Sequence, residues 1–209
     1  MNIVVISSSR IIPNEVRTVV DLFELGLAYF HIRKPRFSKT EMAQYIEEFP
    51  GKYRKRLILH SFHKLAGKYN LGGIHFSRKH RKRGKFYHLK LLYFRIQNPH
   101  LVVTRTFHKL SDLSNDKRIY TYTFLSPVFD SISHSSLSAG FSKRALLVTI
   151  PENKHIIYAL GGIRPENIAL LGELGFAGAA LLGSIWSEKN NPREIYMSSV
   201  EAGRQIPKK

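Results

Sequence analysis

The segment IIYALGGIRPENIALLGELGFAGAALLGSI, residues 156–185, is the part of the chain that decides the fold. Its first five residues are an apolar run rich in β-formers, and a pair of glycines ends this run. Pro165 follows, where a first helical turn tolerates it because the N–H group that proline lacks would have no partner there. Apolar residues then recur at helical spacing up to Gly175, which is suited to end a helix, and residues 176–182 form a second apolar run. The segment therefore predicts two parallel strands joined by a right-handed helical crossover.

Both of these predicted strands end in a glycine turn. Parallel strands that end side by side bring unpaired backbone N–H groups together, and such groups bind anions. In (β/α)8 barrels the loops after strands seven and eight commonly form a phosphate site of this kind. A turn that binds nothing is the plainer interpretation of one glycine turn, but two such turns on successive strands favour a phosphate site. The residues expected to hold the phosphate are Gly161, Gly162, Gly183 and Ser184.

The rest of the chain repeats the alternation of strand and helix. Eight apolar runs predict strands at residues 3–7, 27–32, 56–60, 73–76, 101–104, 120–125, 156–160 and 176–182. Helical spacing predicts helices near residues 13–25, 38–46, 62–69, 88–96, 108–113, 143–148, 165–174 and 192–202. Eight such units predict an α/β fold of one domain over residues 1–209, a compact (β/α)8 TIM barrel. Because 209 residues are few for a barrel, we expect some helices to be shortened, and those after strands three, five and six are the weakest.

Composition sets the broad class of protein. The chain has no cysteine, which excludes disulfides and thiol chemistry and fits a cytosolic protein. Met1 leads directly into an apolar run without the charged region and cleavage site of a signal peptide. No run approaches the roughly 18 apolar residues that a membrane span needs. We therefore expect a cytoplasmic protein without a membrane partner.

The charge balance points to an anionic partner. Lys and Arg number 33 against 15 Asp and Glu, and the formal net charge is +18. Phosphorylated small molecules and nucleic acid are both compatible with this charge. The basic run at residues 78–85, next to Phe86 and Tyr87, is the one nucleic-acid signal, but a solvated loop explains it and no nucleic-acid-binding motif is present. Phosphorylated small molecules are therefore the favoured partners, and a homo-oligomer remains open.

Side chains at the predicted carboxyl ends of the strands indicate the chemistry, because barrel active sites are built there. Nearly all are cationic, hydroxylated or glycine, and Asp130 is the single acid among them. Such a surface suits a multiply charged anion such as a pyrophosphate. It does not suit hydrolysis by a carboxylate pair or a metal held mainly by protein oxygens. The strand ends are Arg33-Lys34, His60-Ser61, Ser77-Arg78, Thr104 to Thr106, Ser126 to His134, Gly161-Gly162 and Gly183-Ser184.

A series of motifs resembles the thiamine-phosphate synthase and thiazole-tautomerase superfamily. In chain order they are HIRK (31–34), LILHSFHKLA (57–66), GGIHFS (72–77), TRTFH (104–108), FLSPVFDSISH (124–134), ALGGI (159–163) and LLGSI (181–185). They span most of the chain, and SPVFDSIS followed by ALGGI is the most specific pair. The resemblance implies a (β/α)8 barrel that joins a pyrimidine diphosphate to a thiazole phosphate and releases pyrophosphate, in thiamine biosynthesis.

The resemblance also implies roles for single residues. Arg33 matches an arginine that contacts the pyrophosphate, and Thr106 matches a hydroxyl near the pyrimidine. Ser131 and Ser133 match hydroxyls that hold phosphate oxygens, and His134 stands where the family has a lysine with that role. The glycine turns match the site of the thiazole phosphate, in agreement with the interpretation of the turns themselves.

Departures from the family concern the metal. Family synthases hold magnesium with Asp residues after strands three and four, and the matching positions are His60-Ser61 and His80. Mg2+ is therefore a cofactor whose usual carboxylate ligands are missing. Our hypothesis is that Arg78, Lys79 and His80 replace part of its charge. The tautomerase's histidine falls at Pro127, which does not support that activity.

The ten histidines do not by themselves predict a metal site, because no pair has the spacing and partners of a zinc motif. We expect His31 and His75, which lie within strands, to be packed rather than catalytic. His108 and His134 are candidates for a proton donor or a phosphate partner. The alternative function is a non-catalytic phosphate-ligand-binding or regulatory homologue that has lost the metal site. A sugar-phosphate isomerase is a more distant alternative, because the strand ends lack a carboxylate base.

Overall fold

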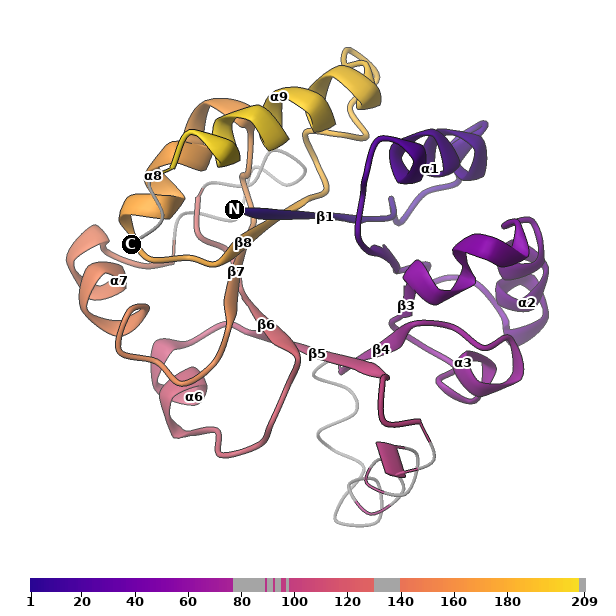
Figure 1. Cartoon of the computed structure of the whole chain (residues 1–209), viewed down its shortest axis with the longest axis horizontal. Coiled ribbons are helices and arrows are strands. Elements are labelled where there is room, and N and C mark those ends of the chain that lie inside the picture. The colour runs from indigo at the N-terminus through magenta and orange to yellow at the C-terminus, as the bar shows by residue number, and fades with distance from the viewer. Residues whose placement is uncertain (77–88, 90–91, 93–94, 97, 130–139, 207–209) are drawn as a thin grey trace.

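The computed structural model describes residues 1–76, 89, 92, 95–96, 98–129 and 140–206, and its strands close into a barrel of eight (Figure 1). All neighbouring strands are parallel, and pairing of β1 with β8, from Asn2↔Gly178 to Val5↔Leu181, closes the ring. The predicted (β/α)8 TIM barrel is therefore confirmed. The strands are β1 (Asn2–Ile6), β2 (Phe30–Ile32), β3 (Leu57–Leu59), β4 (Gly73–Phe76), β5 (Val102–Phe107), β6 (Tyr122–Leu125), β7 (Ile157–Leu160) and β8 (Gly178–Leu181).

Helices surround the barrel on its outside (Figure 1). They are α1 (Glu15–Glu24), α2 (Lys39–Glu47), α3 (Lys64–Lys68), α6 (Leu110–Asn115), α7 (Lys143–Thr149), α8 (Ile168–Glu173) and α9 (Pro192–Arg204), with 3-10 turns η1 (Gly51–Arg56) and η2 (Pro165–Asn167). The helices after strands three, five and six have five, six and seven residues, which confirms the expected shortening. Most of the predicted helix at residues 88–96 lies outside the described residues. In the described part of the chain, no helix has the length and apolarity needed to cross a membrane.

The segment that decides the fold has the predicted form. β7 and β8 pair in parallel, with Tyr158 opposite Gly178 and Leu160 opposite Ala180. Pro165 occupies the first position of η2, and α8 follows directly. Gly175 ends the helix with a φ of 87°, in the left-handed region that favours glycine.

Two strand boundaries differ from the predicted ones by three residues, and the others agree within two residues. β2 begins at Phe30 rather than at residue 27, because the N–H of Leu27 is bonded to the carbonyl of Leu22 as part of the turn that ends α1. β5 extends to Phe107 rather than ending at residue 104, and Thr106 pairs with Phe124 of β6. The residues predicted to follow β5 thus lie within it and alternate between the two faces of the barrel wall.

The apolar residues form two clusters, one on each face of the barrel wall. The larger packs the outer face of the strands against the helices. The smaller fills the barrel interior with Val4, Ile6, Ile58, Val102, Tyr122, Phe124, Tyr158 and Ala180. Three polar side chains share this interior position by strand alternation and are fully or almost fully buried: His31, His75 and Thr104. The interior is therefore apolar except for these polar side chains, which come from β2, β4 and β5.

Candidate active site at the carboxyl ends of the strands

Two glycine turns lie side by side where β7 and β8 end. Gly161 and Gly162 have φ values of 96° and 66°, a left-handed conformation that residues with a Cβ rarely adopt. A Cβ on Gly161 would also meet the Cα of Pro127 at 2.8 Å. Within the described part of the chain, the backbone N–H groups of Gly161, Gly162, Gly183 and Ser184 donate no hydrogen bond. These donors are therefore available to an anion.

An asparagine side chain holds each of these turns in place. Asn167 donates from Nδ2 to the carbonyl of Gly162 at 2.8 Å, and its Oδ1 accepts from the N–H of Arg164 at 3.0 Å. Asn190 donates from Nδ2 to the carbonyl of Ser184 at 2.7 Å. Because both carbonyls are engaged by side chains, the conformation of the two turns is fixed without use of their own N–H groups.

Ser184 adds a side-chain donor to the second turn. The residue is 3% exposed, and its Oγ has no hydrogen-bond partner among the described residues. A buried hydroxyl without a partner costs free energy, about 1–3 kcal/mol. A bound anion that accepts a hydrogen bond from this hydroxyl would remove that cost. We name the two turns, Gly161-Gly162 and Gly183-Ser184, the glycine cradle.

Arg33 stands at the end of β2 with its side chain exposed. Its N–H donates to Ser7 Oγ at 2.7 Å, which ties the end of β2 to the end of β1. The guanidinium makes no ion pair within the described ranges, and its charge is one of the causes that lower the pKa of His60. Arg33 is thus a cation at the open end of the barrel, near His60 and available to an anionic ligand.

Two other cations that the sequence assigned to this end of the barrel face away from it. Lys34 is buried between α1 and α2, where its Nζ lies 2.5 Å from Glu15 Oε2 and donates to the carbonyl of Arg10 at 2.8 Å. Arg105 pairs with Asp116 at 2.5 Å on the outer face of β5. The expectation for these two was wrong because successive residues along a strand point to opposite faces.

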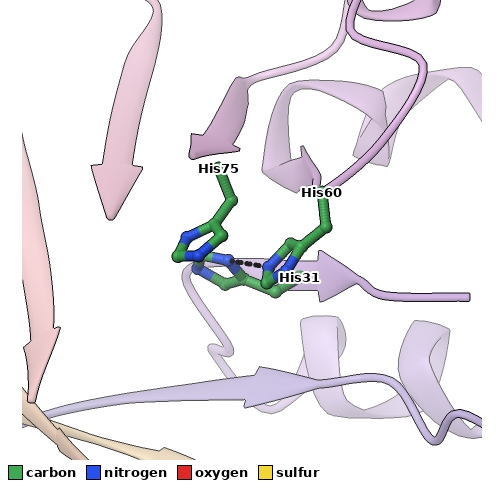
Figure 2. Close-up of side chains that lie close together, drawn as sticks. All are labelled: His31, His60 and His75. Atoms are coloured by element: carbon green, nitrogen blue, oxygen red, sulfur yellow. Dashed lines mark hydrogen bonds between the residues drawn. The ribbon is translucent and has the colours of Figure 1, made fainter. Parts of the chain in front are cut away.

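Thr106 faces the barrel interior and joins a set of hydrogen-bonded histidines. Its Oγ1 lies 3.1 Å from His75 Nε2, while His75 Nδ1 lies 2.8 Å from Thr104 Oγ1. The ring of His75 stacks on that of His60, with centroids 4.0 Å apart and an angle of 16° between the planes. His60 Nε2 in turn lies 3.0 Å from His31 Nδ1. We name His31, His60 and His75 the histidine cluster (Figure 2).

The histidine cluster lies between Thr106 on β5 and Arg33, which follows β2. Its rings converge from β2, from the residue after β3 and from β4 (Figure 2). His31 and His75 are 0% and 2% exposed, and His60 is half-buried. Burial lowers the pKa of His31 to about 3, and burial together with the charge of neighbouring groups lowers the pKa of His60 well below its usual range. The imidazoles of His31 and His60 are therefore uncharged at neutral pH.

Sequence reasoning expected His31 and His75 to be packed, and they are buried as expected. It did not predict that they meet His60. The three residues are far apart in the chain, so no spacing rule joins them. The signal that was present is strand alternation: His31 and Arg33 point to the same side of β2 and its continuation, and His60 and His75 occupy inward positions on the next two strands.

Several of the predicted site residues lie outside the described residues. These are Ser131, Ser133 and His134 after β6, and Arg78, Lys79 and His80 after β4. The described start of the loop after β6 is tied to the glycine cradle, because Val128 and Phe129 donate to the carbonyls of Leu160 and Gly161. His108, a candidate proton donor, is exposed, and its Nδ1 lies 2.8 Å from the carbonyl oxygen of Ser126.

Comparison with known proteins gives a family match over nearly the whole chain. The model of the family described as thiamine monophosphate synthase matches residues 3–185. The solved thiamine phosphate pyrophosphorylase from Bacteroides thetaiotaomicron is 25% identical with a TM-score of 0.70, over 99% of this chain and 95% of that chain. A comparison with curated protein sequences found no match.

More distant solved structures share the fold. The thiamine phosphate pyrophosphorylase from Pyrococcus furiosus is 16% identical with a TM-score of 0.77, over 99% of this chain and 97% of that chain. The geranylgeranylglyceryl phosphate synthase from Thermoplasma acidophilum, solved with sn-glycerol-1-phosphate, is 13% identical with a TM-score of 0.66, over 99% and 94% of the two chains. At these identities the likeness concerns the barrel alone.

Proposed function

The chain belongs to the thiamine monophosphate synthase family, and we propose that it is a transferase that joins a hydroxymethylpyrimidine diphosphate to a thiazole phosphate. Pyrophosphate is the second product. The thiazole phosphate binds in the glycine cradle, and the diphosphate of the pyrimidine binds beside Arg33. Both substrates are phosphorylated small molecules, in keeping with the net charge of +18.

One observation carries this proposal: the glycine cradle offers four backbone N–H groups and the hydroxyl of Ser184, none with a partner in the described part of the chain. Donors fixed in this way bind a phosphate without reorganisation. Asn167 and Asn190 keep the turns in the conformation that exposes the donors. Phosphate sites after strands seven and eight are common in barrels of this type.

The pyrophosphate end of the proposed site uses Arg33 together with hydroxyl groups. Arg33 is exposed and forms no ion pair with any described residue, and a guanidinium can hold two phosphate oxygens at once. Thr106 reaches the same end of the barrel from β5 and approaches the pyrimidine. Ser131, Ser133 and His134 complete this end in the proposal. They follow Val128 and Phe129, whose N–H groups donate to the carbonyls of Leu160 and Gly161.

The reaction needs few protein groups. The C–O bond between the pyrimidine's methylene carbon and the diphosphate breaks, and the electron pair leaves with pyrophosphate. The lone pair of the thiazole ring nitrogen forms the new C–N bond to that carbon. Arg33 compensates the charge that develops on the leaving group, and the glycine cradle holds the ring nitrogen in line for attack.

Magnesium, which the family resemblance implies, does not fit the described residues. Mg2+ prefers oxygen ligands, chiefly carboxylates. Among the described residues at the carboxyl ends of the strands none is a carboxylate, and the side chains near β3 and β4 are imidazoles. We therefore assign no step of the reaction to magnesium.

The test is pyrophosphate release from the two substrates, measured with Mg2+ and with a chelator. We expect release that requires both substrates and falls at least about 100-fold in Arg33→Ala, the loss typical when a donor to a developing anion is removed. Gly162→Ala should weaken binding of thiazole phosphate. Release that is unchanged in both variants would contradict the proposed site.

The second candidate function is a phosphate-ligand binder without turnover. The lack of a carboxylate among the described strand ends favours it, because departure of pyrophosphate usually draws on a metal as well as on Arg or Lys. Saturable binding of thiazole phosphate that Gly162→Ala abolishes, with no pyrophosphate release under any condition, would identify this function.

A further inference from the structure

We propose that His31, His60 and His75 form a binding site for a first-row transition-metal ion such as Zn2+, inside the barrel and next to its open end. The inference goes beyond the proposed function, because metal binding by these imidazoles is measurable without turnover. Each of the three rings comes from a different strand or strand end, and Figure 2 shows them pointing toward one another.

The distances are close to those of a metal site. One ligand nitrogen from each of the three histidines lies within 4.8 Å of the others, and His31 Nδ1 is 3.0 Å from His60 Nε2. Nitrogens bound to one tetrahedral zinc ion lie about 3.3 Å apart, given a Zn–N distance of about 2.0–2.1 Å. The widest pair therefore has to close by no more than about 1.5 Å.

A hydrogen bond orients His31 as metal-bound histidines are oriented, whereas the stacked rings of His60 and His75 have to turn before both direct a lone pair at one ion. His31 Nε2 lies 2.6 Å from the hydroxyl of Tyr122, an oxygen that can accept a proton from Nε2. In that tautomer the lone pair of His31 is on Nδ1, where it can bind a metal. Both ring nitrogens of His75 face threonine hydroxyls, which donate as readily as they accept. Two imidazole nitrogens 3.0 Å apart need a proton or a metal cation between them.

The donor set decides the kind of metal. Three neutral imidazoles suit zinc, copper, nickel or iron, whereas magnesium and calcium prefer oxygen. A site with three protein ligands keeps a fourth position, which is characteristic of catalytic rather than structural zinc.

The experiment is a titration of the untagged, chelator-treated protein with Co2+, followed by its visible absorption, and with Zn2+ in competition. We expect one ion per chain and the intense spectrum of a four-coordinate site. Mg2+ at the same concentration should leave the Co2+ spectrum unchanged. Displacement of Co2+ by Mg2+, or the absence of saturable Co2+ binding, would overturn the proposal.

Substitutions identify the ligands. His60→Ala and His75→Ala should each weaken Co2+ binding by more than the roughly 10- to 100-fold that loss of an orienting partner costs. Tyr122→Phe, which removes only that partner of His31, should weaken it by about 10-fold. His100→Ala is the matched control, since His100 is exposed and precedes β5 at the opposite end of the barrel. Unchanged Co2+ affinity in both His60→Ala and His75→Ala, with native circular dichroism, would show that the metal binds elsewhere.

Discussion

Arg33 and Lys34 are adjacent cations on opposite sides of the barrel wall. Arg33 is exposed at the open end, whereas the side chain of Lys34 is 1% exposed and forms an ion pair with Glu15. Tyr45 donates to the same carboxylate at 2.8 Å, and Ser8 donates its N–H at 3.1 Å. Lys34 therefore ties α1 and α2 to the end of β2 and has no access to a ligand in the barrel.

Lys34→Met is expected to destabilise the fold without changing the site. The substitution leaves the charge of Glu15 buried and uncompensated, which costs about 3–5 kcal/mol. Denaturant unfolding measures this loss, and the affinity for thiazole phosphate should stay within about 2-fold of the wild type. Adding Glu15→Gln removes the charge, keeps an acceptor oxygen for the N–H of Ser8 and offers an N–H that the Tyr45 hydroxyl can accept. It should restore most of the stability. A large loss of affinity in Lys34→Met under native conditions would mean that Lys34 does serve the ligand.

The ionised carboxylate of Asp116 makes the stability of the fold depend on pH in the acid range. Burial alone would raise the pKa of Asp116, but hydrogen bonds from Arg118 and the charges of Arg118 and Arg105 outweigh it and hold the pKa below its usual 3.8. A carboxylate with a lowered pKa in the folded state contributes stability above its unfolded pKa, and this stability is lost as pH falls through the lowered value. Thermal unfolding should therefore show that the wild type loses stability as pH falls, and that Asp116→Asn lacks this part of the loss. At pH 7 the variant should be less stable than the wild type by about 1–3 kcal/mol. Parallel pH profiles for the two proteins would contradict this.

Single residues show where the sequence is informative and where it is not. The glycines of the cradle could be predicted from the sequence, because a turn with positive φ favours glycine and the pair Gly161-Gly162 can be read directly from the chain. The direction of the Lys34 and Arg105 side chains could not be predicted, because a shift of one residue in a strand's pairing register moves every side chain to the other face. His31, His60 and His75 meet only after the barrel has closed.

At the scale of structural elements, the conformation of each of the two glycine turns depends on one asparagine. Asn167→Ala removes the donor to the carbonyl of Gly162 and the acceptor for the N–H of Arg164. We expect thiazole phosphate to bind about 5-fold more weakly, as one hydrogen bond worth about 1 kcal/mol no longer fixes the turn. Isothermal titration calorimetry measures the change.

Asn153→Ala is the control for that substitution. Asn153 also fixes a turn, because its Oδ1 accepts from the N–H of His155 at 3.0 Å, but this turn precedes β7 at the other end of the strand. Its replacement should leave the affinity unchanged. Equal losses in the two variants would mean that the effect arises from general destabilisation rather than from the cradle.

Among the elements, those with local signals could be predicted from the sequence. The capping box of Ser38 and Glu41 begins α2 as expected, with mutual hydrogen bonds between side chain and backbone. Gly175 ends α8, and the strands of the β7–β8 unit match the predicted runs within two residues. The start of β2 could not be predicted, because Leu27 is as apolar as a strand residue and its hydrogen bond to Leu22 belongs to the preceding helix.

At the scale of the whole molecule, the count of eight alternating units was enough to predict a closed barrel. Closure pairs β8 with β1, and β1 pairs with β2. It therefore brings the glycine cradle after β8 and Arg33 after β2 to the same end of the barrel, on the two strands that flank β1, and Ser7 after β1 accepts from the N–H of Arg33.

The net charge of +18 should make ligand capture depend on salt. Association of thiazole phosphate can be followed by the fluorescence of Trp186, the single tryptophan, which lies just beyond the cradle and donates from Nε1 to the carbonyl of Ile6 at 2.6 Å. Raising sodium chloride from about 0.05 M to about 1 M shortens the screening length several-fold, so the association rate constant should fall by about 10-fold or more. The unphosphorylated thiazole alcohol carries no charge to steer, and its association should respond little. If salt slowed both ligands equally, the field of the molecule would not be what brings the phosphate to the barrel.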